Sequence, residues 1–195
     1  GRELHSGYDL KTARRSMNLL TIEWANRGIN MWTIDEGFIN LVQGTSTYDL
    51  PAATIDLIEQ VIRTGAGSTT LQSDLNLSRI SVSTYSSVPN KLTQGRPIQV
   101  WVDRLRDNPT VTVWPVPDRG TAIAPYYILR YWRLRRIENA GAGIETPDMN
   151  FRFFPALVSG LAYYIATKIP ELMPRVEMLK SQYEEQYALA AGEDR

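Results

Sequence analysis

Residues 97–120 read PIQVWVDRLRDNPTVTVWPVPDRG, and this stretch decides the fold of the middle of the chain. Apolar and polar side chains alternate over 97–104 and again over 110–115, which is the period of a strand with one buried face. The Asp, Asn, Pro and Gly residues of 106–109 and 117–120 are typical of turns. Strands joined by such short loops pair antiparallel, so we expect an antiparallel sheet here.

Weaker strand patterns lie on both sides of this stretch. We predict strands at 36–43, 57–63 and 126–134, and a short helix within 78–86 that has Asp74 or Asn76 near its cap. The glycine-rich segment 65–68 lacks the Lys and the spacing of a phosphate-binding loop, so we interpret it as a turn after a strand. The β-rich region therefore spans about 32–137.

Helical periodicity marks the residues before this region. Asp9 can cap a helix over 10–27, and Gly28 can end it in the left-handed conformation. The apolar stripe of this helix consists of Leu10, Ala13, Met17, Leu20 and Trp24.

Two further helices are predicted after the β-rich region. One covers about 151–168, with Pro155 in its first turn, Leu161 at the centre of its buried stripe and Pro170 beyond its end. The other follows Pro174. The predicted fold class is α+β: one domain over 1–195, with a bundle of one N-terminal and two C-terminal helices (about 8–28 and 151–190) and an inserted antiparallel β-sheet.

Composition narrows the classes of function. Lys and Arg number 21, and so do Asp and Glu, so the net charge is zero and a dedicated nucleic-acid binder is disfavoured. The chain has no cysteine, and His5 is its single histidine, so we expect no metal site and no cofactor. A carboxylate pair for glycoside hydrolysis could come from Glu23, Glu36, Glu59 and Asp103. Such pairs occur in any chain with this many acidic residues and carry little weight. We expect no catalytic residues and no enzyme activity.

The segment 130–136 (RYWRLRR) interleaves basic and aromatic residues. In a strand its arginines can reach carboxylates of neighbouring strands, and Arg and Trp are also favoured at protein interfaces and in contacts with nucleic acid. All three interpretations stay open. The candidate residues for a subunit or tail interface are Arg130, Trp132, Arg133, Arg135 and Arg136.

The last eight residues, 188–195, are small and then charged. They offer little apolar area to offset the entropy lost on ordering, so we expect them to be mobile in the free chain. The longest apolar run, Ala156 to Ile165, is too short to cross a membrane, and no signal peptide is visible. Because the chain begins at Gly1 without Met, we expect that an N-terminal segment is missing.

Several short motifs follow one another in a fixed order along nearly the whole chain. They are 22–32 (IEWANRGINMW), 48–51 (YDLP), 78–80 (SRI), 89–91 (PNK), 95–97 (GRP), 114–117 (WPVP) and 155–164 (PALVSGLAYY). Taken together, from about residue 4 to 195, they resemble the head-to-tail adaptors of short-tailed bacteriophages, also called tail tubular proteins. Similar proteins usually carry a further helical segment before the position of Leu4.

The resemblance implies a structural role in the neck of a virion, assembled in the host bacterial cytoplasm. Adaptors of this kind form a ring, typically dodecameric, under the portal protein, and double-stranded DNA passes through its lumen. The C-terminal arm docks on the portal and other surfaces receive the tail nozzle. The family has no catalytic residues and no membrane contact. The candidate portal-docking residues are Leu189, Glu193, Asp194 and Arg195.

Other classes of protein remain as alternatives. A different neck or tail-completion ring protein would have the same physical properties and would differ only in the partner that it binds. A cell-wall-active enzyme or a nucleic-acid-binding module fits the sequence less well. The identity of the phage and host, the ring order and the surface that meets each partner do not follow from the residues.

Overall fold

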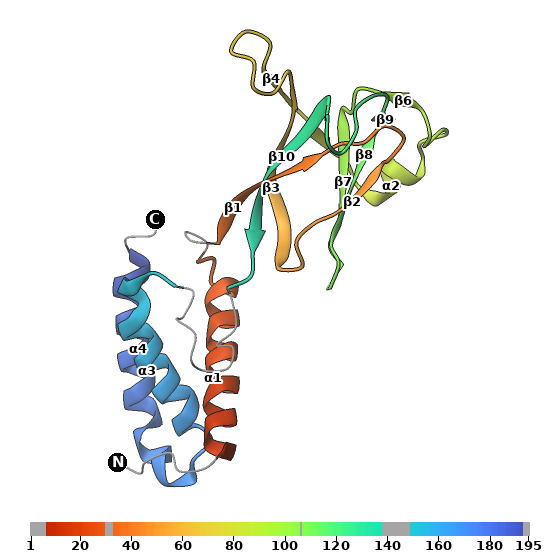
Figure 1. The fold of residues 1–195 in the computed structure, drawn as a ribbon. Helices are drawn as coiled ribbons and strands as arrows, with labels where there is room; N and C mark the ends of the chain where they lie inside the picture. Colours follow the sequence, from red (N-terminus) through yellow and green to blue (C-terminus); the bar gives the residue numbers. More distant parts are fainter. Residues whose placement is uncertain (1–6, 30–32, 106, 138–148, 193–195) are drawn as a thin grey trace. The chain divides into compact units, whose positions relative to one another are not determined.

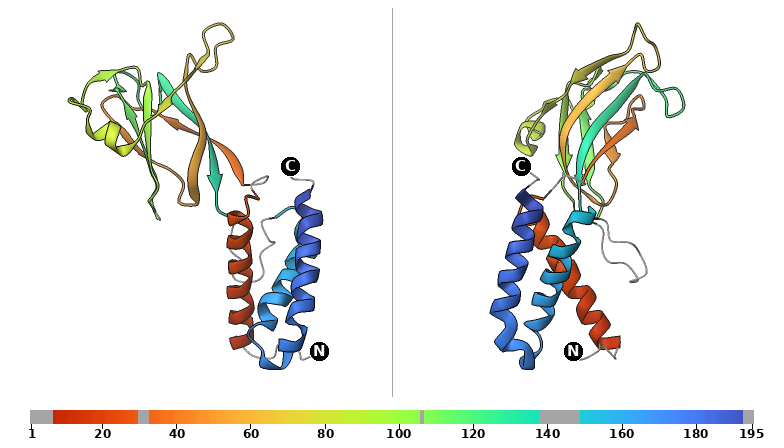
Figure 2. Two further views of the ribbon diagram at one scale, coloured as in Figure 1. Left: turned by 180° about the vertical axis from the view of Figure 1, so that it is seen from behind. Right: turned by 90° about the vertical axis from the view of Figure 1, so that its left-hand side faces the viewer.

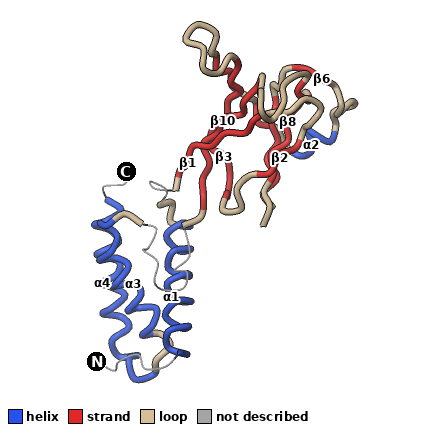
Figure 3. Tube along the Cα trace, viewed as in Figure 1, coloured by secondary structure: helices blue, strands red, loops and turns tan. Residues whose placement is uncertain are grey.

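The computed structural model describes residues 7–29, 33–105, 107–137 and 149–192. The chain clusters into two compact units, a helical unit (Gly1–Trp32 with Ile137–Arg195) and a β unit (Thr33–Arg136). Figures 1 and 3 show the helical segments at both ends of the chain and the strands between them. The predicted α+β class, with β structure inserted between the first helix and the last two, is confirmed.

The helical unit contains α1 (Gly7–Asn26), α3 (Phe154–Ala166) and α4 (Val176–Gly192). Because α1 already begins at Gly7, Asp9 lies inside its first turn and does not cap it, contrary to the prediction. Gly28 does end the helix in the left-handed conformation, with a φ of 85°. Pro155 lies in the first turn of α3, where its missing N–H costs no helical hydrogen bond.

The core of the helical unit forms around Trp24 of α1. Its ring lies 5.5 Å from that of Phe153. Gly160 of α3 allows the helices to approach closely, because a Cβ there would lie 2.9 Å from both Leu20 and Tyr183. The fully buried members of this cluster are Leu20, Trp24, Phe153, Ala156 and Tyr183.

The buried face of α3 differs from the predicted one. Ala156, Leu157, Gly160 and Ala166 are buried, whereas Leu161 is only partly buried. The prediction that Leu161 lies deep between helices is therefore wrong. Most residues of α3 are apolar and none is charged, so composition alone does not reveal which side of the helix faces its neighbours.

Two four-stranded sheets make up most of the β unit. In the first sheet the strand order is β1 (Ile34–Asn40), β10 (Tyr127–Arg135), β3 (Thr54–Thr64) and β4 (Ser73–Asn76), and all neighbours are antiparallel. In the second sheet the order is β2 (Thr47–Asp49), β8 (Thr110–Trp114), β7 (Gln99–Asp103) and β5 (Ser78–Arg79). The predicted antiparallel pairing of the strands at 97–104 and 110–115 is confirmed by β7 and β8.

Short parallel pairs complete the β unit and were not predicted. The pair β5–β7 is parallel, as is the separate pair of β6 (Gln94–Gly95) and β9 (Val116–Pro117). The only helix described in this unit is the short α2 (Val82–Ser86), which falls within the predicted 78–86. Its N-cap is Ser81, whose side chain accepts a hydrogen bond from the Thr84 N–H, so Asp74 and Asn76 do not cap it.

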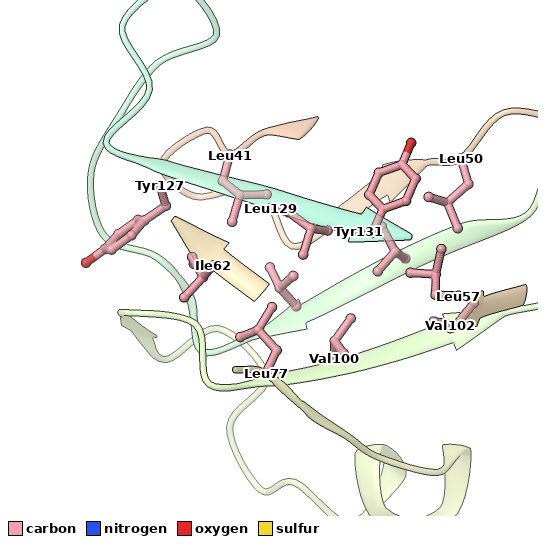
Figure 4. Packing of buried hydrophobic residues seen from close by; sticks show 12 residues of the cluster. Leu41, Leu50, Leu57, Ile62, Leu77, Val100, Val102, Tyr127, Leu129 and Tyr131 are labelled. Carbon is pink, nitrogen blue, oxygen red and sulfur yellow. The ribbon is translucent and has the colours of Figure 1, made fainter. Parts of the chain in front are cut away.

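The two four-stranded sheets share one apolar core, seen in Figure 4. Strand β10 supplies Tyr127, Leu129 and Tyr131 to it, in alternation with residues that face the other way. Val100 and Val113 meet them from the second sheet. Because β10 pairs with β1 on one side and β3 on the other, it is the central strand on which the first sheet is built.

We expect Leu157→Ala to lower the free energy of unfolding by roughly 2–5 kcal/mol, the usual cost of a large-to-small change in a core. Leu161→Ala, four residues along the same helix, should cost clearly less because Leu161 is partly exposed. Urea denaturation of both variants measures the difference. An equal or larger loss at Leu161 would contradict this assignment of the buried face.

Candidate interaction sites

The arginines of the predicted basic strand form ion pairs with the neighbouring edge strand. Arg130 pairs with Glu36 of β1. Asp35 of β1 accepts from the Arg133 Nη2 at 3.1 Å and from the Arg135 Nε at 3.0 Å. The side chains of Arg133 and Arg135 are each only 15% exposed, so these pairs lie near the edge of the core and not out in solvent. The structure thus shows the first of the three interpretations, arginines that reach carboxylates across the sheet.

The other two residues of this strand region are placed differently. Trp132 is partly buried and lies between Glu36 of β1 and Glu59 of β3 in the register of the sheet. Arg136 is exposed, and its backbone N–H donates to the Ala53 carbonyl at 2.9 Å. The five candidate residues therefore lie together on one strand and its end. Trp132 and Arg136 make fewer contacts with other charged groups of the chain than Arg133 does.

A polar network joins the three helices of the helical unit, and it has Glu23 of α1 at its centre. The Glu23 carboxylate accepts from the Tyr164 hydroxyl at 2.6 Å and from the Tyr183 hydroxyl at 3.1 Å. The Trp24 indole N–H donates to the same Tyr183 oxygen at 3.0 Å. Burial and then the bond to Glu23 raise the pKa of Tyr164 to about 12. Burial likewise raises the pKa of Tyr183, so both phenols stay protonated donors at neutral pH.

Arg27 extends this network toward α4. It donates two hydrogen bonds of 2.8 Å to the Glu184 carboxylate and lies 2.5 Å from a Glu23 oxygen. The guanidinium also stacks over the Tyr187 ring at 4.5 Å. The hydrogen bonds from Arg27 hold the pKa of Glu184 below its usual value. Glu184 is therefore a structural partner of α1. The Glu23 carboxylate is itself bound by Tyr164, Tyr183 and Arg27.

The candidate portal-docking residues lie at the end of the chain. Helix α4 continues to Gly192, and Ala190 is buried in the core of the helical unit, so residues 188–192 belong to a helix. The mobility expected for residues 188–195 stays a prediction. Leu189 points the other way and is 66% exposed. Glu193, Asp194 and Arg195 lie outside the described residues.

Several important positions were not found by sequence reasoning. Tyr164 and Glu23 are 141 residues apart and Asp35 and Arg133 are 98 apart, so no local pattern links them. The adjacent acidic residues Asp35 and Glu36 of β1 can be read from the sequence, but their partners depend on the pairing of β1 with β10. Exposed apolar side chains on loops of the β unit were also missed, because exposure depends on the tertiary fold.

Within the described part of the chain, no group of three or more His, Cys, Asp or Glu residues could hold a metal ion. None of the helices described there is long and apolar enough to cross a membrane. The sites described above consist of ion pairs, aromatic rings and hydroxyls that bind one another.

The structure defines an α+β protein built from a helical unit and a β unit. The family model for the SU10 adaptor protein matches residues 3–195. A comparison with curated proteins finds no match. The chain belongs to the SU10 adaptor protein family and is thus a structural adaptor of a bacteriophage virion, of the head–tail kind that the sequence motifs predicted.

We expect Asp35→Ala to destabilise the β unit by roughly 1–3 kcal/mol, since it leaves two largely buried arginines without their carboxylate. Asp49→Ala on β2 serves as the control, because Asp49 is exposed and lies outside these ion pairs. Urea denaturation followed by tryptophan fluorescence measures both. Equal stabilities for the two variants would show that the ion pairs contribute nothing.

Glu184→Gln should lower the free energy of unfolding at pH 7 by roughly 0.5–1 kcal/mol, because the Arg27–Glu184 pair is partly exposed and screened. The folded-state pKa of Glu184 lies below its ordinary 4.5, so its contribution is present above pH 4.5 and is lost as the pH falls further. The difference from the wild type should therefore shrink between pH 5 and pH 3. Glu185→Gln, at the neighbouring exposed position, is the control for removal of a charge from α4.

Proposed function

We propose that twelve copies of this adaptor form a ring that joins the portal protein to the tail nozzle in the virion neck. Family membership over residues 3–195 is the observation that carries this proposal. The structure supports it with two compact units that expose large apolar side chains as possible contacts, among them Leu189 on α4 and Ile123 in the β unit. Assembly takes place in the cytoplasm of the host bacterium.

The exposed end of α4 is the proposed portal-docking site. Ala190 and Tyr183 hold this helix to the core, while Leu189 on its outer side is free to enter a partner. A side chain presented on an ordered helix loses little entropy on binding. Glu193, Asp194 and Arg195 follow directly in the sequence and would add polar contacts.

The strand end with Arg130, Trp132, Arg133, Arg135 and Arg136 is the proposed contact to a neighbouring subunit or to the tail. A ring requires two different patches of one chain to meet, and complementary charge suits such a contact. Arg136 is exposed, while Arg130, Arg133 and Arg135 already carry carboxylate partners. We therefore assign the direct contact to Trp132 and Arg136, and the support of that contact to the paired arginines.

DNA contact in the lumen is proposed to be transient and independent of base sequence. A chain with zero net charge has no excess of cations with which to retain DNA, and a conduit must release it. Another neck or tail-completion protein remains the alternative role, and it differs only in the partner that the ring binds.

Leu189→Ser should weaken binding of the full chain to purified portal protein by about fivefold or more, the effect of losing an apolar contact at an interface. Met178→Ser is the matched control, because Met178 is also exposed on α4 but lies near the start of that helix. A chain shortened by residues 193–195 tests the polar contacts without removing Ala190. Circular dichroism confirms that each variant is folded, and equal binding by all of them would refute docking by this end.

A further inference from the structure

Helix α3 carries an apolar stripe on the side that faces away from the core of the helical unit. Its residues follow one another at alternating intervals of three and four, the spacing of a seam along which a helix packs. Phe151, just before the helix, is 76% exposed, Phe154 is 38% exposed and Val158 is 68% exposed. Leu161 and Ile165 continue the stripe and are partly buried. The buried residues of α3 lie on its other side, so most of this α3 stripe is open to solvent.

The first sheet has a second apolar surface, on the face turned away from the β core. Strand β10 alternates between the two faces of the sheet, and its odd-numbered residues from Tyr127 to Tyr131 enter the core. The even-numbered residues of β10 and their register partners on β1 therefore form the outer sheet face. Figure 2 shows β10 running between β1 and β3. The apolar members of the outer sheet face on these two strands are Ile34, Phe38, Ile128, Trp132 and Leu134.

This outer sheet face is accessible as well as apolar. Phe38 is 67% exposed and Ile34 is 45% exposed, while Ile128, Trp132 and Leu134 are partly buried. A pocket of about 320 Å³, lined by Phe38 and Ile128 among others, lies on this face. It offers space for a side chain that protrudes from a partner.

The charges of the two surfaces are compatible. On the outer sheet face Arg130 pairs with Glu36, and Arg63 of β3 pairs with Asp74 at 2.6 Å. Glu59 of β3 is exposed, at the margin of a contact that covers β1 and β10. Helix α3 has no charged residue. Packing the α3 stripe on this face therefore leaves the ion pairs intact and buries no unpaired charge.

The two surfaces also match in size. From Phe151 to Ile165 the α3 stripe is about 21 Å long by the rise of an α-helix. Strand β1 has seven residues and is about 20 Å long by the rise of a strand. A helix about 10 Å across covers about two strands at their usual spacing, here β1 and β10.

We propose that the α3 stripe of one copy packs on the outer sheet face of the next copy in the ring. The inference rests on the proposed ring and names the surface that meets Trp132. A head-to-tail ring requires two different patches on every subunit that fit each other. The α3 stripe and the outer sheet face are two such patches, and each copy covers both of them through its two neighbours.

Other occupants cover only part of this apolar surface. A two-fold contact between the α3 stripes of two copies closes at two subunits and leaves the outer sheet face exposed. A portal or nozzle subunit on either surface leaves the other one without a partner. DNA and membrane surfaces are bound through basic residues beside the contact, and α3 supplies none.

Cysteine cross-linking tests the contact, because the chain has no cysteine of its own. Phe38→Cys and Val158→Cys are purified as separate full-length chains and assembled with portal protein of the same phage. A short bismaleimide should link the two variants into dimers when they are mixed and should link neither variant to itself. A chain with both changes should give a ladder of dimers, trimers and larger products.

Leu92→Cys is the matched control for Phe38→Cys. Leu92 is 81% exposed in the β unit but lies outside the first sheet, so it should give no dimer with Val158→Cys. Thermal unfolding verifies that every variant folds, and electron microscopy verifies that rings have formed.

Each other result overturns the inference in a distinct way. Dimers of Val158→Cys alone assign the α3 stripe to a two-fold contact. A double variant that is linked only within one chain assigns the outer sheet face to α3 of the same copy. Equal amounts of dimer with Leu92→Cys show chance collision, and rings without any cross-link refute the contact while the adaptor function stands. A wild-type chain that forms no ring on the portal contradicts the proposed function itself.

Discussion

The pairing of β1 with β10 is the constraint on which the rest of the structure depends. The β unit is inserted between α1 and α3, so its first and last strands must lie together if the chain is to return to the helical unit. Ile34 is the register partner of Leu134, and the Arg135 N–H donates to the Thr33 carbonyl at 2.8 Å. This pair closes the insertion and allows the helices on either side to build one core.

The basic strand takes its unusual composition from the same constraint. Strand β1 is an edge strand, and Asp35 and Glu36 on it face arginines of β10. Ion pairs at a sheet edge add to the backbone hydrogen bonds and leave fewer unpaired charges there. A pattern that suggests nucleic-acid binding in the sequence is thereby accounted for within the fold, and the proposed contact surface narrows to Trp132 and Arg136.

In the helical unit, polar side chains fix how the three helices pack against one another. Helix α3 has no charged residue, so it gains no ion pair of its own with its neighbours. The Glu23 carboxylate binds the hydroxyls of Tyr164 and Tyr183, and Arg27 binds Glu184, so α1 is tied to both other helices at defined points. Such fully bonded groups specify one arrangement of apolar helices that could otherwise slide. An adaptor benefits because its contact residues then keep fixed positions within each unit.

The sequence by itself determined the class of fold, the three long helices, and the strands at 36–43, 57–63, 97–104, 110–115 and 126–134, because hydrophobic period and turn residues are local signals. The ordered motifs also sufficed to indicate the adaptor family. Only the tertiary structure decided that the strands divide into two four-stranded sheets and one two-stranded sheet. It also decided that α3 buries Leu157 in preference to Leu161 and that Asp35 meets Arg133. It alone showed Phe38 of β1 and Val158 of α3 exposed to solvent. The reason is that pairing and exposure depend on residues far apart in the chain, whose separation no local pattern encodes.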